Sequence, residues 1–130
     1  MLPEETKTLK KIAESLPNGD CSPVAPFTGL VANLNVATVG HRDLNDQTLC
    51  AVLGFDHCIG GYFMMYESGI IIQIRTGDWL AFNSDKFTHL NEHVVGKRAS
   101  FVFHTDAGFR NWVEGNFNGW GNSQAFARPR

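Results

Sequence analysis

Membrane-spanning and secreted proteins are marked by long apolar segments, and this sequence lacks them. None of its apolar runs approaches the roughly 18 residues of a transmembrane helix. Its first residues, MLPEETKTLKK, contain no apolar stretch like that of a secretory signal peptide. We therefore expect no membrane partner and a location in a reducing intracellular compartment, either nuclear or cytoplasmic.

Cysteine and net charge are also scarce. The three cysteines, Cys21, Cys50 and Cys58, are odd in number and do not have metal-ligand spacing, so a disulfide framework is not expected. Eleven Lys and Arg residues meet thirteen Asp and Glu residues, which gives a formal net charge of −2. Nucleic-acid-binding domains usually carry a strong basic excess, so any such surface here would have to be a local patch.

What the sequence does contain is aromatic and apolar material for one core. Hydrophobic residues make up 43% of the 130 positions, and ten Phe, three Trp and two Tyr are among them. This length fits a single domain over residues 1–130. Aromatic residues are enriched in strands, so the composition favours sheets over a helix bundle.

One amphipathic helix is predicted near the start, over residues 3–16. Pro3 and the acidic pair Glu4-Glu5 suit a first helical turn, where proline costs no hydrogen bond and carboxylates face the positive end of the helix dipole. Pro17 then acts as a stop signal. Apolar residues recur at helical spacing, at Leu9, Ile12, Ala13 and Leu16.

A loop rich in Pro and Gly follows, and after it the pattern becomes that of short strands separated by turns. We expect an all-β sandwich or barrel over residues 30–105, with a loop at Asp56-His57-Cys58 and an irregular or short-helical tail over 106–130. The predicted strands cover residues 30–39, 48–55, 62–67, 69–75, 78–83, 87–95 and 98–104.

Two of the five histidines have an aspartate two positions on. Residues two apart in an extended chain point the same way, so His41 and Asp43 would converge on one face. His104 and Asp106 have the same spacing, but no later histidine follows them, and we interpret them as a strand exit. The spacing alone is therefore uninformative, and the surrounding residues decide.

Further residues downstream complete a pattern around the first pair. A divalent iron takes a third protein ligand and keeps positions open for chemistry, and His89 is the candidate. Nine residues later, Arg98 and Ser100 open a strand on which a guanidinium and a hydroxyl share a face. Such a pair suits a carboxylate, because the guanidinium fork matches two oxygens.

The ordered set His41-x-Asp43, His89 and Arg98-x-Ser100 resembles the Fe(II)/2-oxoglutarate-dependent oxygenase superfamily. Between them lie Gly60-Gly61-Tyr62-Phe63 and Gly77-Asp78-Trp79-Leu80-Ala81-Phe82. These segments resemble the GG…GD…F pattern that precedes the distal histidine in that family. The resemblance covers most of the chain. It implies a mainly β, double-stranded β-helix fold (jelly roll, cupin-like) preceded by the N-terminal amphipathic helix.

The resemblance also implies cofactors and roles. By it, His41, Asp43 and His89 are the catalytic residues and bind Fe(II), while O2 and 2-oxoglutarate are co-substrates. Arg98 and Ser100 would bind the distal carboxylate of 2-oxoglutarate. Two further residues are candidates for the co-substrate pocket, namely Asn35, which lies at an even spacing from His41, and Tyr62.

Within the superfamily, Asn33-Leu34-Asn35, His41-Arg42-Asp43 and the close Arg-x-Ser ending are most similar to the TET/JBP branch. That branch oxidises the 5-methyl group of pyrimidines in nucleic acid, which implies a nucleic-acid substrate and a base flipped into the pocket. Three alternatives stay open: a non-catalytic jelly-roll binding module, an oxygenase core that has lost its recognition parts, and a cupin-like metalloprotein. The absence of a His-x-His pair counts against the cupin-like alternative.

Overall fold

The structure is a computed structural model, and it describes residues 3–16 and 19–114. Its helical elements are α1 (Pro3–Ser15), the 3-10 turn η1 (Gly19–Cys21) and α2 (Gly108–Glu114). Its strands are β1 (Gly29–Leu34), β2 (Cys50–Gly60), β3 (Phe63–Met65), β4 (Ile70–Ile72), β5 (Trp79–Phe82), β6 (His89–Asn91) and β7 (Val94–His104).

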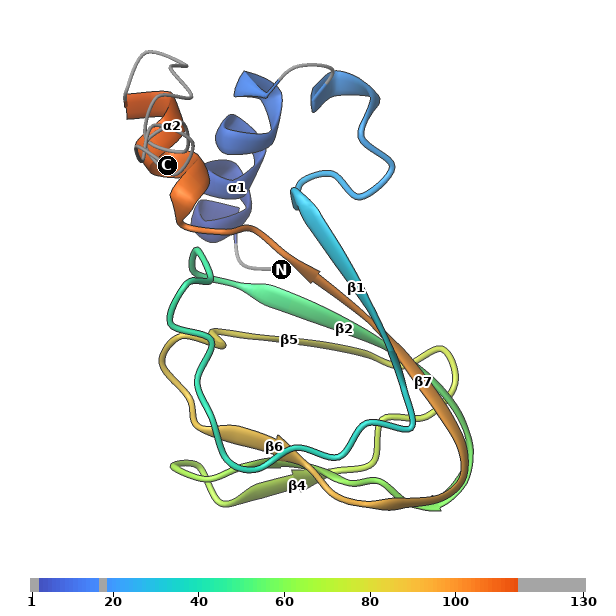
Figure 1. The fold of residues 1–130 in the computed structure, drawn as a ribbon. Coiled ribbons are helices and arrows are strands. Elements are labelled where there is room, and N and C mark those ends of the chain that lie inside the picture. Colours follow the sequence, from blue (N-terminus) through green and yellow to red (C-terminus); the bar gives the residue numbers. More distant parts are fainter. Residues whose placement is uncertain (1–2, 17–18, 115–130) are drawn as a thin grey trace, which may run out of the picture.

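Two antiparallel sheets face each other (Figure 1). The larger sheet has the order β1-β7-β2-β5 and the smaller has the order β4-β3-β6. The long strands β2 and β7 pair along most of their length and curve together towards the smaller sheet. The helices α1 and α2 lie side by side beyond the end of the larger sheet where β1 begins and β7 ends. The expected mainly β, double-stranded β-helix fold with an N-terminal helix is confirmed.

The apolar core fills part of the space between the sheets. Side chains alternate between the two faces of a strand, so Cys50 and Val52 of β2 point inward together. They meet Phe63 of β3 and Phe82 of β5, whose rings pack edge to face with centroids 5.2 Å apart. The remaining space between the sheets is available for a pocket.

Two predicted strands, 87–95 and 30–39, differ from the observed strands. The run 87–95 is not one strand, because the chain turns at Glu92 and His93, and β6 and β7 belong to different sheets. The predicted strand 30–39 stops at Leu34, since Asn35 adopts a positive φ of 50° and leaves the extended conformation.

The loop expected at Asp56-His57-Cys58 is also wrong, since these residues lie inside β2. They pair with Arg98, Lys97 and Gly96 of β7. Backbone hydrogen bonds to β7 hold this polar stretch in the sheet. The polar side chains of Asp56 and His57 therefore do not exclude a strand at these positions.

The tail expected over 106–130 begins with the short helix α2, and residues 115–130 lie outside the described residues. At the other end of the chain, Leu9 and Ala13 form the buried face of α1. Among the described residues, no helix is both long and apolar enough to cross a membrane.

Candidate active site

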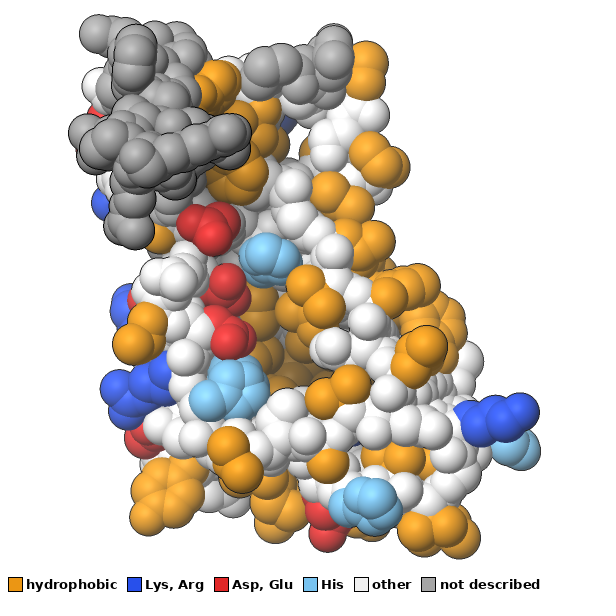
Figure 2. Space-filling view, viewed as in Figure 1, with side chains coloured by type: hydrophobic (Ala, Val, Ile, Leu, Met, Phe, Trp, Pro, Cys, Tyr) orange, Lys and Arg blue, Asp and Glu red, His pale blue; other side chains and the backbone are white. Residues whose placement is uncertain are grey.

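A pocket of about 330 Å³ lies between the two sheets. Its floor is apolar and is formed by Val52, Phe63, Phe82 and Val102. Figure 2 shows the hollow with hydrophobic side chains inside it and with histidine and acidic side chains along one edge. Histidine and acidic side chains therefore lie along one edge of the hollow, its rim, beside an apolar floor.

His41, Asp43 and His89 come together at this rim. Asp43 Oδ1 lies 3.7 Å from His41 Nε2, and Asp43 Oδ2 lies 3.4 Å from His89 Nε2. One ligand atom from each residue falls within 4.8 Å of the others. Two imidazoles and one carboxylate thus converge on a single point, which is the arrangement that a 2-His-1-carboxylate metal centre requires.

The hydrogen bonds of the two imidazoles leave the correct nitrogen free. His41 Nδ1 lies 2.8 Å from the carbonyl oxygen of Val39, and His89 Nδ1 lies 2.9 Å from that of Phe87. A carbonyl oxygen only accepts, so each Nδ1 carries the proton and donates it. In the neutral imidazole, each Nε2 then presents its lone pair to the pocket, as a metal ligand must.

His89 is the most firmly held of the three residues. Its exposed fraction is 5%, and its ring stacks on Phe63 with centroids 5.6 Å apart. Phe82 packs against the same ring edge to face at 4.9 Å. His41 and Asp43 are half-buried on the connection between β1 and β2. One candidate ligand, His89, therefore lies in a strand, and the other two lie in a loop.

Arg98 lies in a small recess beside the pocket, with an exposed fraction of 8%. Its guanidinium donates to Asn91 Oδ1 at 2.9 Å, and no carboxylate of the described residues lies within ion-pair distance of it. Burial lowers the pKa of Arg98, opposed by the charges of Cys58 and Asp56. Arginine nevertheless stays charged at neutral pH, so this is a buried cation with spare hydrogen-bond donors.

The recess adjoins the pocket that His41, Asp43 and His89 line. Asn33, Asn91 and Ser100 line both spaces, and Ser100 is buried. The structure therefore brings five of the seven predicted site residues to one pocket and its recess.

Asn35 and Tyr62 are not brought to the pocket. Asn35 pairs with the backbone of Arg98: its amide donates to the Arg98 carbonyl at 2.8 Å, and its Oδ1 accepts from the Arg98 amide at 2.7 Å. Its side chain borders a groove with Phe55 and Lys97 instead. Tyr62 precedes β3, is 38% exposed and does not line the pocket. Asn33, two residues before Asn35, occupies the expected place.

A second polar group lies at the pocket and was not predicted from the sequence, namely the pair of Asp46 and His104. Asp46 Oδ1 lies 3.6 Å from His104 Nδ1, and its Oδ2 accepts a hydrogen bond from Ser84 Oγ at 2.5 Å. Burial raises the pKa of Asp46, opposed by the Ser84 hydrogen bond. His104 does end its strand as predicted, but it shares the inward face of β7 with Ser100, and that parity could have indicated the pocket.

No family model and no curated protein matches the sequence. Among solved structures, the chain is similar to NgTET1 in complex with 5mC DNA, with a TM-score of 0.68 and 15% identity over 78% of this chain and 42% of that chain. A Pseudomonas putida prolyl-4-hydroxylase matches with a TM-score of 0.48 and 17% identity, over 61% of this chain and 52% of that chain.

The chain thus spans about two-fifths of the length of NgTET1. At 15% identity the likeness concerns the fold. The fold of this chain is therefore similar to that of NgTET1, and the same chain brings His41, Asp43 and His89 together.

Proposed function

We propose that the protein is an Fe(II)- and 2-oxoglutarate-dependent dioxygenase. The observation that carries the proposal is the convergence of His41 Nε2, His89 Nε2 and the Asp43 carboxylate at one edge of the pocket. Two neutral imidazoles and one carboxylate suit a divalent iron and occupy only one face of its coordination sphere. His41, Asp43 and His89 would hold the metal.

Arg98 and Ser100 would hold 2-oxoglutarate. A buried guanidinium without a carboxylate partner among the described residues is costly unless an anion pairs with it, so the recess favours a ligand carboxylate. The Ser100 hydroxyl adds a donor on the same side. When bound, Fe(II) with 2-oxoglutarate and O2 supplies the oxidant that inserts one oxygen into a substrate C–H bond, while 2-oxoglutarate becomes succinate and CO2.

The remaining residues of the pocket orient the substrate and keep water out. Phe63 and Phe82 form an apolar floor, against which the reacting part of a substrate can rest. Asp46 and His104 offer hydrogen bonds at the rim. A pocket of about 330 Å³ is at the small end of the range for small-molecule sites, which suits one ring system.

As substrate we propose the 5-methyl group of a pyrimidine. Enzymes that modify a base bring it into a pocket and read its polar edge with hydrogen bonds, stacking it on aromatic or apolar side chains. The 4-amino group of a methylated cytosine can donate a hydrogen bond to the Asp46 carboxylate, and Phe63 or Phe82 can face the ring. NgTET1, to which the fold is similar, is in complex with 5mC DNA.

A free methylated nucleoside is the second candidate substrate. The rim carries the carboxylates of Asp43 and Asp46, and Asp106 lies close enough to Asp46 to raise its pKa. An acidic rim repels the phosphates that flank a base in DNA, whereas a nucleoside carries none. The pocket would accept the same base in both cases.

The visible spectrum under anaerobic conditions tests the enzyme proposal. With Fe(II) and 2-oxoglutarate added, we expect a weak metal-to-ligand charge-transfer band that requires both additions. Absence of the band together with absence of 2-oxoglutarate binding would contradict the proposal and favour a non-catalytic jelly-roll binding module.

Mass spectrometry then tests the substrate. The protein is incubated with Fe(II), 2-oxoglutarate and O2, and either DNA that contains 5-methylcytosine or 5-methyl-2′-deoxycytidine. Oxidised methyl groups in the DNA support the first substrate, and oxidation of the nucleoside alone supports the second. Succinate formation with both substrates unchanged would reject a 5-methylpyrimidine and retain the dioxygenase.

A further inference from the structure

Glu67, in the turn between β3 and β4, accepts hydrogen bonds from two separate segments. Its Oε1 lies 2.5 Å from an Arg42 guanidinium nitrogen and 2.7 Å from Thr88 Oγ1. Its Oε2 accepts from the Thr88 amide at 2.8 Å. Arg42 Nε also donates to Thr88 Oγ1 at 3.1 Å, so the three side chains form a closed ring of contacts.

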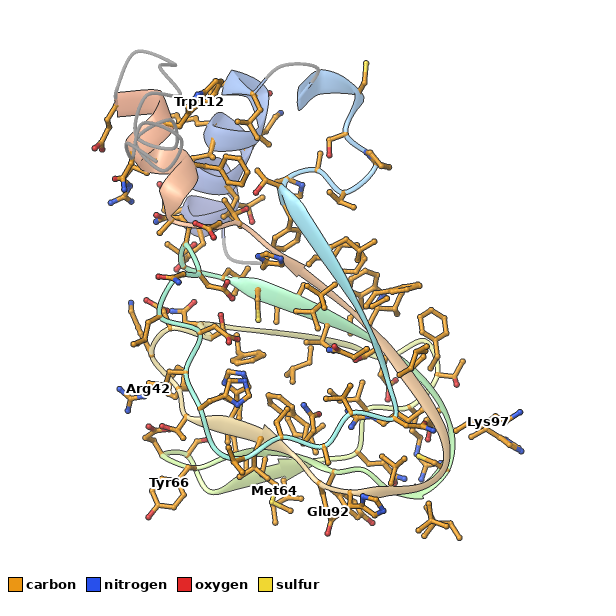
Figure 3. All side chains as sticks on the ribbon, viewed as in Figure 1. Arg42, Met64, Tyr66, Glu92, Lys97 and Trp112 are labelled. Atoms are coloured by element: carbon orange, nitrogen blue, oxygen red, sulfur yellow. The ribbon has the colours of Figure 1, made fainter. Side chains whose placement is uncertain are left out.

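Arg42 and Thr88 are direct neighbours of the candidate metal ligands in the sequence. Arg42 stands between His41 and Asp43, and Thr88 directly precedes His89. Because side chains alternate in extended backbone, the neighbours of pocket-facing ligands point outward. Figure 3 shows Arg42 on the outside of the molecule. The outward neighbours of all three candidate ligands therefore meet at one carboxylate on the outer surface.

The segment that carries His41 and Asp43 needs such a hold. It belongs to the long connection between β1 and β2, where Val39 is 84% and Leu44 is 77% exposed. His89, by contrast, lies in β6 and is packed between aromatic rings. The spacing of the ligand atoms thus depends on how the connection is attached to the strand region that bears His89.

We propose that Glu67, with Arg42 and Thr88, is a positioning cluster that holds the two ligand-bearing segments at the spacing that a metal ion requires. This inference rests on the proposed function of His41, Asp43 and His89. None of the three cluster residues touches the metal position, and they act through the ligands beside them.

The cluster contributes to preorganisation more than to folding. The side chains of Arg42 and Glu67 are 46% and 33% exposed, and ion pairs with this exposure add little to the free energy of unfolding. Partners that orient metal ligands are worth far more to the metal, typically about 10–100-fold in affinity. Loss of the cluster is therefore expected to affect metal binding out of proportion to stability.

The test measures Mn(II) affinity by electron paramagnetic resonance titration, and the melting temperature of the metal-free protein. We expect Glu67→Gln to raise the Mn(II) Kd about 10-fold and to lower the melting temperature by no more than about 3 °C. The matched control is Glu4→Gln, which breaks an exposed ion pair to Lys7 of 2.8 Å on α1 and should leave the Kd unchanged.

Two substitutions of Thr88 separate positioning from general structure. Thr88→Val removes the hydroxyl and should raise the Kd, whereas Thr88→Ser keeps the donor and should preserve it. A wild-type Kd in Glu67→Gln would overturn the proposal. So would a loss of affinity that merely follows the loss of folded protein.

Hydrogen exchange makes the two proposals separable. In the metal-free protein, Glu67→Gln should speed amide exchange in the segment from His41 to Asp43, and Glu4→Gln should not. If wild-type protein binds no Mn(II), the proposed metal function fails, while the exchange rates still decide whether the cluster holds the segment. Unchanged exchange in Glu67→Gln overturns the cluster.

Discussion

His41 and His89 are joined through their backbones, since the amide of each donates to the carbonyl oxygen of the other at 3.0 Å. Their ring centroids lie 4.5 Å apart. This reciprocal pair attaches the backbone of the His41 segment to β6, and the contacts of Glu67 with Arg42 and Thr88 attach the same two segments through side chains. The amide of Asp43 is bonded to the Ser84 carbonyl at 3.0 Å.

Replacement of the buried histidine tests this centre directly. His89→Ala removes one of three ligands, so we expect it to abolish the charge-transfer band that Fe(II) and 2-oxoglutarate produce in wild-type protein. His93→Ala is the matched control, because His93 is exposed and does not line the pocket. A band of equal strength in both variants would remove His89 from the metal centre.

The buried guanidinium makes a separate prediction about the co-substrate. Arg98→Gln should weaken 2-oxoglutarate binding by about 10–100-fold, because a hydrogen bond to a charged group contributes about 1.5–3 kcal/mol. Mn(II) affinity should be retained. Calorimetric titration with each ligand gives both constants.

Lys97→Gln is the control for this change of charge, since Lys97 lies next to Arg98 but points into solvent (Figure 3). It should leave both constants unchanged. Equal loss of metal and 2-oxoglutarate in Arg98→Gln would mean that Arg98 supports the fold and does not bind the co-substrate.

Strand parity explains which site residues could be predicted from the sequence. Arg98 and Ser100 lie within one unbroken strand, so their common face follows from their spacing. His41 and Asp43 also share one face, because the chain is extended where His41 forms a backbone bridge with His89. The prediction that Asn35 faces the pocket is wrong. Its positive φ ends β1, so the alternation of side-chain faces does not continue from Asn35 to His41.

Other parts depend on contacts between distant segments. The pairing of Asp56 with Arg98 holds a polar stretch within β2, and no local pattern indicates it. Asp46 contacts His104 because the connection between β1 and β2 lies beside the end of β7, where Asp46 forms a backbone bridge with Asp106. Residues that act through such long-range neighbours carry no local signal.

The Asp46 and His104 pair predicts a variant that separates substrate from co-substrate. Asp46→Asn should raise the KM for the methylated base or nucleoside and leave Fe(II) and 2-oxoglutarate binding intact, since Asp46 lies beyond the three ligands. Succinate would then form with less oxidised base per turnover. Glu92→Gln is the control, because Glu92 is exposed and outside the pocket lining. Equal behaviour of the two variants would exclude Asp46 from substrate binding.

The acid side of the stability curve reports on Glu67. Hydrogen bonds from Thr88 and Arg42 lower the pKa of Glu67 from 4.5 to about 2. A lowered carboxyl pKa adds stability above the ordinary value, and this contribution is lost as the pH falls from about 4.5 to about 2. Because solvent screens this exposed pair, the contribution is small, and urea unfolding of metal-free Glu67→Gln should show a slightly shallower loss of stability in that interval than wild type. Parallel curves would contradict the assignment.

The packing of Phe63 links the core to the metal centre. Phe63 is 3% exposed and contacts both Phe82 and the ring of His89. Phe63→Ala leaves a cavity, so we expect a loss of about 3–5 kcal/mol in the free energy of unfolding. Phe63→Leu keeps most of the volume and should cost less, but it removes the stacked ring and frees His89. In that variant the Mn(II) Kd should rise even though the protein stays folded, and an unchanged Kd would show that β6 alone holds the histidine.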